Sequence, residues 1–234
     1  MFGMESISKS NYGIFQIIKE NKAFFIPYAI IICISTIVLA ILGNTPLFHF
    51  INQHHSKLTD FLFFGFTMLG DGTIAFLIIF ILMWISMREA ITLLVITLLI
   101  TIIIALLKRF IFAEYDRPLM FFGEQMIRIV PGYMPPKLHT FPSGHSATAF
   151  STYLYVSFLV RQNGIKFSLF LVAFMIAYSR IYLSAHFPAD VIAGSLLAVL
   201  ITILVYLYFQ RIKFSWIDRK IVFNPFRIPR EQTA

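Results

Sequence analysis

Charged residues and cysteine are both scarce in this chain of 234 residues. Asp, Glu, Lys and Arg make up 13% of it, against 59% hydrophobic residues and a mean hydropathy of +0.81. About a quarter of the residues in a typical soluble domain are charged, so this composition excludes that class and predicts an integral membrane protein. The only cysteine, Cys33, excludes an internal disulfide and a thiolate metal site, and we expect it to be a small core residue.

Long apolar runs recur along the sequence, without an internal repeat or a low-complexity segment. A helix needs roughly 20 apolar residues to cross a hydrocarbon core about 30 Å thick. The first run follows Lys19 and Lys22, as a signal peptide would, but it is long for one and lacks a small-residue cleavage site. We interpret it as a retained anchor. We therefore predict an all-α polytopic membrane bundle with six transmembrane helices, at approximately residues 24–43, 72–87, 90–107, 146–161, 167–184 and 190–210.

Basic residues near the ends of these runs predict the orientation, because Lys and Arg tend to remain on the cytoplasmic side. With a cytoplasmic N-terminus, the inner side holds twelve of the nineteen: Lys9, Lys19, Lys22, Arg88, Arg161, Lys166, Arg211, Lys213, Arg219, Lys220, Arg227 and Arg230. Much of the formal net charge of +8 lies in this set, which indicates a membrane surface rather than nucleic acid as the partner.

This orientation divides the chain into three parts, in a protein that we expect in a bacterial inner membrane. Residues 1–23 form a cytoplasmic N-terminal segment, residues 24–210 the membrane domain and residues 211–234 a basic cytoplasmic tail. On the outside, residues 44–72 are expected to form a loop and an interfacial helix, and residues 108–145 a long loop.

Polar residues gather at the outer ends of the predicted spans in three short stretches. These are LLKRFIFAEYDRP (106–118), FPSGHSATAF (141–150) and YSRIYLSAHFPADVIAG (178–194). A charge at membrane depth is costly and usually lines a cavity or a site. Because all three stretches lie on the same face in the predicted topology, we expect them to form one site.

The second and third stretches contain groups suited to phosphate chemistry. Ser143 can cap a helix that opens at Gly144, and the free N–H groups of its first turn make an anion site. His186 precedes a helix and Asp190 lies four residues on, so the carboxylate can accept a hydrogen bond from the imidazole and set its tautomer. His186 can then attack phosphorus, while His145 protonates the leaving oxygen and later activates water.

Three cations complete the inventory of the candidate site: Lys108, Arg117 and Arg180. Arginine forks and backbone amides match the equatorial oxygens of a transferring phosphoryl group, and catalysis of that transfer is mostly positioning and charge neutralisation. We therefore expect a reaction that requires no metal and no other cofactor.

Two of these patterns resemble the second and third signature motifs of the type 2 phosphatidic acid phosphatase (PAP2) family, which shares its helical core with vanadium-dependent haloperoxidases. They are PSGH at residues 142–145 and, from Ser179 to Asp190, SR, five residues, H, three residues, D. The resemblance covers roughly residues 59–210. It implies a six-span membrane core, no metal cofactor and an active site on the side of the membrane that faces away from the cytoplasm. It implies His186 as the nucleophile, Asp190 as its orienter, His145 as the acid and base, and Ser143, Gly144 and Arg180 as phosphate ligands.

The first motif departs from the family pattern. Members usually have Lys, six residues and then Arg-Pro, whereas eight residues separate Lys108 from Arg117 here, and Phe110 stands seven before Arg117. Arg117 carries over as a phosphate ligand. For the lysine two arrangements stay open: the two extra residues bulge out and Lys108 binds phosphate, or Arg109 supplies the charge instead.

Other polar residues of the long outer loop are expected to be structural. His139 is interpreted as a loop residue, with substrate contact as the alternative. Glu124 and Arg128, spaced four apart, are expected to pair on an amphipathic interfacial helix. The apolar residues of the segment 119–136 are expected to rest in the membrane interface and help to admit a lipid tail.

Other classes of protein share part of this pattern. An anion transporter would also line a cavity with Lys and Arg, but it does not call for an Asp-buttressed histidine facing a second histidine. A rhomboid-like intramembrane serine protease shows glycine two positions before the serine and three after the histidine, where this chain has Phe141 and Ala189. A vanadate haloperoxidase would suit a soluble protein better.

We therefore predict an integral membrane phosphatase that hydrolyses a lipid phosphate or diphosphate. Proteins resembling this one act on undecaprenyl diphosphate, phosphatidylglycerophosphate, phosphatidate and lipid A phosphates, and the headgroup contacts lie outside the motifs. We favour undecaprenyl diphosphate, because outward-facing bacterial members often recycle that carrier. No pattern in the sequence indicates an oligomeric state.

Overall fold

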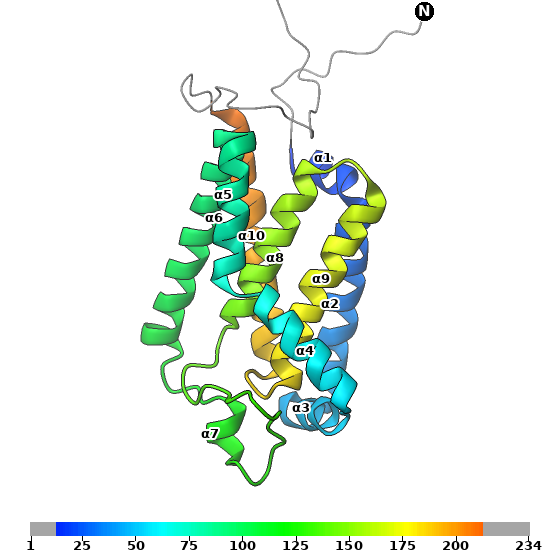
Figure 1. Ribbon diagram of the computed structural model, residues 1–234, viewed down its shortest axis with the longest axis vertical. Helices are drawn as coiled ribbons and strands as arrows, with labels where there is room; N and C mark the ends of the chain where they lie inside the picture. Colours follow the sequence, from blue (N-terminus) through cyan, green and yellow to red (C-terminus); the bar gives the residue numbers. More distant parts are fainter. Residues whose placement is uncertain (1–12, 213–234) are drawn as a thin grey trace, which may run out of the picture.

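The structure, a computed structural model, describes residues 13–212, which form helices and loops without a strand (Figure 1). The all-α prediction is therefore confirmed. In chain order the elements are α1 (Ile14–Glu20), α2 (Lys22–Leu42), α3 (Asn44–Gln53), α4 (Lys57–Leu69), α5 (Gly72–Ile85), α6 (Met87–Leu106), the π-helical turn η2 (Leu107–Ile111), α7 (Pro118–Phe122), α8 (Gly144–Leu159), α9 (Asn163–Tyr182) and α10 (Pro188–Arg211).

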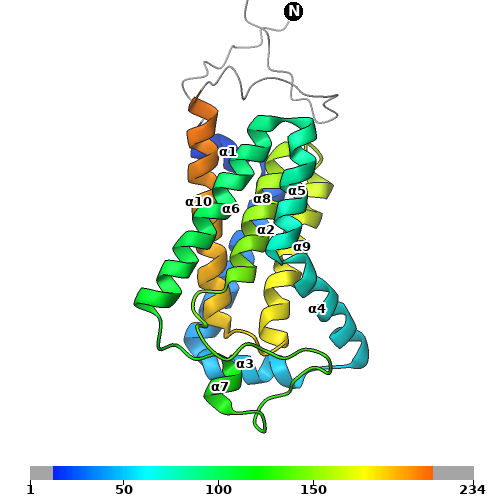
Figure 2. The same cartoon turned by 60° about the vertical axis from the view of Figure 1, so that its left-hand side comes forward.

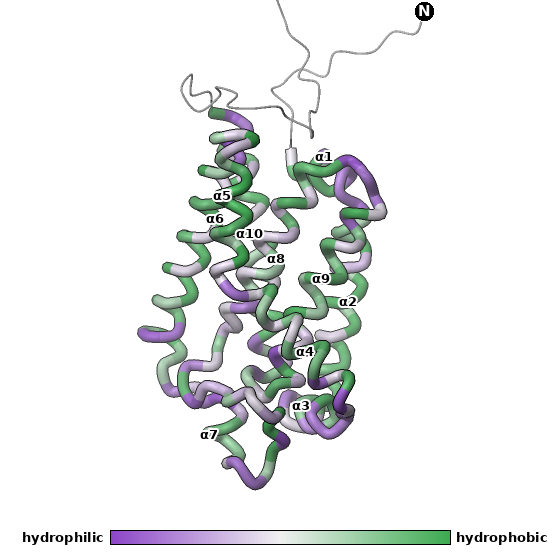
Figure 3. The backbone as a smooth tube through the Cα atoms, viewed as in Figure 1, coloured by the Kyte–Doolittle hydropathy of each residue, from purple (hydrophilic) through white to green (hydrophobic). Residues whose placement is uncertain are grey.

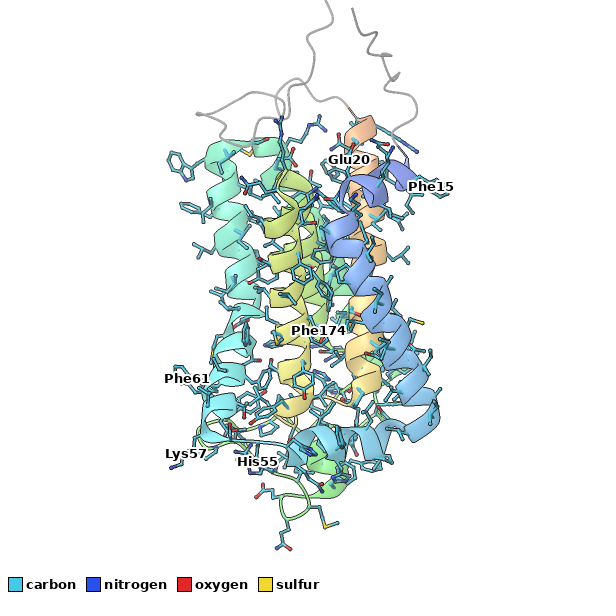
Figure 4. All side chains as sticks on the ribbon, turned by 90° about the vertical axis from the view of Figure 1, so that its right-hand side faces the viewer. Phe15, Glu20, His55, Lys57, Phe61 and Phe174 are labelled. Carbon is cyan, nitrogen blue, oxygen red and sulfur yellow. The ribbon has the colours of Figure 1, made fainter. Side chains whose placement is uncertain are left out.

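The long helices run side by side, and the short ones cover the two ends of the bundle. In Figure 1 α2, α5, α6, α8, α9 and α10 follow the long axis, while α3 and α7 lie at the end opposite α1 and the end of α10. Figure 3 shows hydrophobic residues along the helices and hydrophilic segments toward both ends. The polar residue Glu20 lies at one end, and His55 and Lys57 lie at the other (Figure 4). Polar residues at both ends are expected of a bundle that spans a bilayer.

Four helices in the described part of the chain are long and apolar enough to cross a membrane: Lys22–Leu42, Met87–Ile111, Asn163–Tyr182 and Pro188–Arg211. A fifth candidate is the pair α4 and α5, which meet at an angle of 51°. α8 has 16 residues, fewer than the roughly 20 that a full crossing needs. The structure thus has four or five candidate spans, although each of the six predicted runs coincides with a helix.

α8 occupies the centre of the bundle, packed against α6, α9 and α10 (Figure 2). Most of its residues are buried, and many of them are small, such as Ala147, Ala149 and Ser151. Small residues let neighbouring helices approach closely at membrane depth. Because other helices enclose α8, it can contain more Ser and Thr than a helix that faces lipid.

The break between α4 and α5 lies beside α9. A Cβ atom on Gly70 would lie 2.3 Å from Cγ2 of Ile176, so only glycine permits this approach. The hydroxyl of Tyr153 donates to the carbonyl of Leu69 at 3.2 Å, which satisfies an acceptor that the end of α4 leaves free. Before this break, residues 44–72 contain two helices, α3 and α4, whereas the sequence predicted a loop and one interfacial helix.

The ends of the predicted membrane domain can be compared with the structure only in part. Residues 1–12 of the predicted N-terminal segment and residues 213–234 of the predicted tail lie outside the described residues. Within the described part, α1 precedes the first long helix and α10 continues to Arg211. Cys33 is exposed on α2, most of whose surface faces outward, so the expectation of a core position is wrong.

Candidate active site

The three polar stretches meet where α9 ends and α8 and α10 begin. The backbone N–H of Ser143 donates to the carbonyl of Asp190 at 3.0 Å, which joins the starts of α8 and α10. In the turn after α9, the N–H groups of Ala185 and His186 both donate to the carbonyl of Arg180, at 2.9 and 3.1 Å. Short backbone contacts of this kind hold the polar side chains of different helices in one place.

His186 is held through both of its ring nitrogens. Its Nδ1 lies 3.2 Å from Oδ2 of Asp190, and Nη1 of Arg117 lies 3.2 Å from its Nε2. Arginine can only donate, so the hydrogen-bond pattern assigns the proton to Nδ1 and leaves the lone pair on Nε2. Burial and the positive charges of Arg117, Arg180 and Lys108 lower the pKa of His186 well below its usual value, so the ring is neutral.

Asp190 accepts hydrogen bonds from three groups at Oδ2. Besides His186, the backbone N–H of Phe187 donates to it at 2.9 Å, and the hydroxyl of Thr140 donates to the same oxygen. Thr140 Oγ1 also lies 3.3 Å from Nδ1 of His186. Thr140 belongs to none of the sequence patterns that identified the other residues, because no periodicity or family motif marks it.

Arg117 reaches the histidine from the loop that precedes α7. Its Nε donates to the carbonyl of Leu138 at 2.7 Å, and its Nη1 also donates to the carbonyl of Ala185 at 3.0 Å. Burial and the charge of Arg180 lower the pKa of Arg117 to about 10, which leaves the guanidinium protonated at neutral pH. The site therefore keeps a fixed positive charge beside Nε2 of His186.

Arg180 is oriented by two residues that sequence reasoning missed. Its Nη1 donates to the hydroxyl of Thr67 on α4, and its Nη2 donates to the hydroxyl of Tyr133 at 3.0 Å. The side chain is 3% exposed, and its buried Nε has no hydrogen-bond partner among the described residues. A buried N–H group without an acceptor lowers the stability of the fold, so the Nε of Arg180 is suited to donate a hydrogen bond to a bound anion.

Lys108 and His145 complete the group of site residues. Both are half-buried, and the charges of Arg117 and Arg180 act on each of them. Lys108 lies in η2 and also interacts with the charge of Asp190, whereas its neighbour Arg109 is exposed. Of the two candidate cations, it is Lys108 that lies near the other charges of the site.

The start of α8 has the geometry of a capped helix. Ser143 is buried, and its Oγ accepts from the N–H and the hydroxyl of Ser146, at 3.4 and 2.9 Å. In the described part of the chain nothing accepts from the N–H groups of Gly144 and His145, which are the first of the helix. This arrangement suits anion binding, and it engages Ser143 with Ser146 rather than with a histidine as a serine protease requires.

The long outer loop differs from its prediction. Residues 123–129 are not helical, and Arg128 pairs with Asp60 on α4, so the expected pair with Glu124 is wrong. Asn52 fixes the same loop, since its Oδ1 accepts from the N–H of Arg128 at 2.9 Å. His139 is exposed, as expected of a loop residue.

Several apolar side chains of this loop are exposed at the end of the bundle that holds the site, namely Met120, Phe121, Met126, Met134 and Leu138. Among the described residues, no group of three or more His, Cys, Asp and Glu side chains is placed to hold a metal ion. The expectation of a reaction without a metal stays a prediction.

Comparison with known proteins identifies relatives of this chain. A sequence profile of the PAP2 superfamily matches residues 89–214. A lipid A 4'-phosphatase of Bacteroides thetaiotaomicron is 35% identical over 57 residues, which are 24% of this chain and 25% of that protein. A lipid A 4'-phosphatase of Porphyromonas gingivalis is 27% identical over 99 residues, 42% of each chain. The matched regions thus span less than half of these curated relatives.

Two crystal structures resemble this one over most of their length. LpxE of Aquifex aeolicus is 32% identical with a TM-score of 0.64, and the match covers 70% of this chain and 95% of that one. A transmembrane PAP2-type phosphatidylglycerolphosphate phosphatase of Bacillus subtilis shares the fold, at 19% identity and a TM-score of 0.59, with 83% and 98% of the two chains covered. The chain is therefore an integral membrane protein with several transmembrane helices. Because the profile covers more than half of it, and because PSGH and the SR–H–D pattern lie within the match, the protein belongs to the PAP2 superfamily.

Proposed function

We propose that this protein is a membrane phosphatase that hydrolyses a lipid phosphate through a phosphohistidine at His186. The observation that carries the proposal is the pair of contacts on that ring. Nδ1 lies 3.2 Å from the carboxylate of Asp190, and Nε2 lies 3.2 Å from the guanidinium of Arg117. A neutral imidazole with its lone pair on Nε2, beside cations that attract phosphate, is an activated nucleophile.

The proposed reaction has two steps. When the phosphate binds, the guanidinium of Arg117 turns from Nε2 of His186 to a phosphoryl oxygen, and the negative charge of the phosphate favours protonation of His145. Nε2 then attacks phosphorus as the bond to the lipid oxygen breaks, and protonated His145 gives its proton to that oxygen. Asp190 stabilises the positive charge that develops on the ring. In the second step His145 takes a proton from a water molecule that attacks the phosphohistidine. Inorganic phosphate leaves, and both histidines return to their starting states.

The remaining site residues are proposed to bind the phosphoryl oxygens. Lys108, Arg117 and Arg180 supply positive charge, and Nε of Arg180 offers an N–H that has no partner among residues 13–212. At the start of α8 the N–H groups of Gly144 and His145 are proposed to bind the same phosphoryl group, and Ser143 caps the helix. In this proposal the charge of the transition state is neutralised by protein groups alone.

We propose a bacterial inner-membrane location with both termini cytoplasmic and the site on the extracytoplasmic face. The described chain begins and ends at one end of the bundle, opposite α7 (Figure 1). The six crossings of this proposal include α8, whose 16 residues rise about 24 Å at 1.5 Å each. Its contacts with α6, α9 and α10 separate it from lipid, so it need not match the full thickness of the hydrocarbon core.

The substrate class that we propose to test first is lipid A carrying a phosphate. Both curated relatives are named lipid A 4'-phosphatases, which outweighs the preference for undecaprenyl diphosphate drawn from the sequence. Undecaprenyl diphosphate, phosphatidylglycerophosphate and phosphatidate remain as comparison substrates. The exposed apolar side chains beside the site, such as Phe121 and Met126, support a substrate whose tails stay in the bilayer.

The deciding experiment measures phosphate release by detergent-purified protein in EDTA. The four lipids and a soluble phosphate monoester are compared, with His186→Ala as the inactive variant and the exposed His55→Ala as its control. We expect release from one lipid by the wild type and by His55→Ala, and none by His186→Ala. Equal rates on soluble and lipid phosphates would refute a lipid substrate. Phosphate flux into vesicles without release from any lipid would favour an anion transporter.

A further inference from the structure

A hydroxyl group lies against the proposed nucleophile at Nδ1, the ring nitrogen opposite the proposed attacking atom Nε2. It belongs to Thr140, which is 2% exposed and donates to Oδ2 of Asp190. We propose that Thr140 is a positioning residue, which fixes His186 and Asp190 in the geometry that the reaction needs. This inference rests on the proposed function, because it assigns Thr140 a part in the same reaction.

Three atoms form a closed triangle at this point. Thr140 Oγ1 lies 3.3 Å from Nδ1 of His186, Nδ1 lies 3.2 Å from Oδ2 of Asp190, and the hydroxyl closes the third side. Because the hydroxyl proton goes to the carboxylate, the hydroxyl oxygen is free to share the Nδ1–H proton. The ring therefore has two acceptors for one N–H, and the carboxylate is held by a donor outside its own helix.

The backbone places Thr140 so that one segment holds both sides of the imidazole. The carbonyls of Lys137 and Leu138 accept from the N–H and the Nε of Arg117, at 3.2 and 2.7 Å. Two residues on, the N–H of Thr140 donates to the carbonyl of Tyr115 at 3.0 Å. Residues 137–140 thus carry the acceptors that orient Arg117 toward Nε2 and the hydroxyl that faces Nδ1.

His139 has an unusual backbone conformation. Its φ of 56° lies in the left-handed region, which non-glycine residues adopt at some cost. His139 lies between Leu138, whose carbonyl accepts from Arg117, and Thr140, whose hydroxyl donates to Asp190. A strained residue at this place is consistent with a segment whose geometry is set by the site on either side of it.

The test replaces the hydroxyl by a methyl group of the same shape. In Thr140→Val the imidazole keeps Asp190 but loses its second acceptor, and the carboxylate loses a donor. Hydrogen bonds to charged groups are worth enough to change a rate roughly 10- to 100-fold. We expect kcat to fall by that factor with KM unchanged, because Thr140 faces Nδ1 and the phosphate approaches Nε2. Thr140→Ser, which keeps the hydroxyl, should restore most of kcat.

The measurement is kcat and KM on the lipid that the wild type hydrolyses, together with the rate of phosphoenzyme formation after rapid acid-free quenching. Thr97→Val is the matched control, because Thr97 is a buried threonine of α6 whose hydroxyl donates to Leu93 of its own helix. It should leave kcat unchanged. Thr140→Ala replaces the valine variant if the latter does not fold, and it should lose kcat to the same extent.

The outcomes separate this inference from the proposed function. If the wild type hydrolyses a lipid and Thr140→Val or Thr140→Ala matches it in kcat, the positioning role is wrong and the phosphatase stands. A rise in KM at constant kcat, or a serine variant as slow as the valine variant, would also overturn the role. If the wild type releases phosphate from no lipid, the proposed function fails, and the role of Thr140 fails with it.

Discussion

The close approach of α10 to the start of α8 makes Gly194 a sensitive position. A Cβ atom built on Gly194 would lie 2.4 Å from the carbonyl oxygen of Ser143 and 3.3 Å from its carbonyl carbon and its nitrogen. These are backbone atoms, so no side-chain rotation can relieve the contact. Gly194→Ala therefore has to push the start of α8 away from α10.

The size of the effect follows from that distance. Ordinary contacts of a Cβ atom begin near 3.4 Å, so one of the two helices must move by about 1 Å. Overpacking of this kind costs about 1–3 kcal/mol of stability. Asp190 lies one turn before Gly194, and the N–H of Ser143 donates to the carbonyl of Asp190. The shift therefore changes the position of His145 relative to His186. A misplacement of about 1 Å at a catalytic site can lower the rate about 100-fold.

The assay compares kcat/KM and thermal stability of Gly194→Ala with those of Gly65→Ala. Gly65 is a helical glycine of α4 with nothing within 4 Å of its Cβ position. Its replacement should leave activity unchanged and stabilise the helix by up to about 1 kcal/mol. We expect Gly194→Ala to lose activity by a larger factor than its loss of stability explains. Wild-type activity and stability in Gly194→Ala would refute the packing argument.

Three further predictions concern single residues of the site and its loop. Lys108→Ala should lower kcat/KM roughly 10- to 100-fold, as the loss of a charged hydrogen bond does, whereas Arg109→Ala should change it less than about twofold in the same assay. In a histidine-labelled NMR titration assigned with His186→Ala, the imidazole of His186 should stay neutral at pH 6.5, where a free imidazole is half protonated, because burial and the nearby cations lower its pKa. Titration near 6.5 would contradict this. His139→Gly should keep kcat/KM and raise the melting temperature, because glycine removes the cost of about 1 kcal/mol that a left-handed conformation imposes on histidine. A loss of activity would instead favour contact between His139 and the substrate.

Much of the fold could be predicted from the sequence, because apolar runs and helix-starting residues are local features of the chain. Each predicted apolar run coincides with a helix, and Pro188 begins α10 as a proline in the first turn should. The grouping of Ser143, His145, Arg180, His186 and Asp190 was also accessible, since the residues stand at helix ends that the hydrophobic pattern locates. Their roles in catalysis stay a prediction until the variants are measured.

The sequence did not predict the remaining contacts of the site, because the residues that make them are distant in the chain. Thr67 and Tyr133 contact Arg180 from 113 and 47 residues away, and neither position carries a periodic or motif signal. The partner predicted for Arg128 was wrong for a related reason, because a spacing of four indicates a pair only if the segment is helical. Its segment is a loop, and its partner Asp60 is 68 residues away on α4.

The unusual spacing between Lys108 and Arg117 has a structural explanation in the end of α6. The N–H of Phe112 donates to the carbonyl of Leu107 at 2.8 Å, five residues back, so η2 contains one residue more than an α-helical turn. Beyond it, residues 112–114 form a turn that can take up further length. Lys108 is placed by η2, which continues α6, whereas Arg117 is placed by the carbonyls of Lys137 and Leu138. Because different elements hold the two cations, the number of residues between them can change while both charges stay at the site.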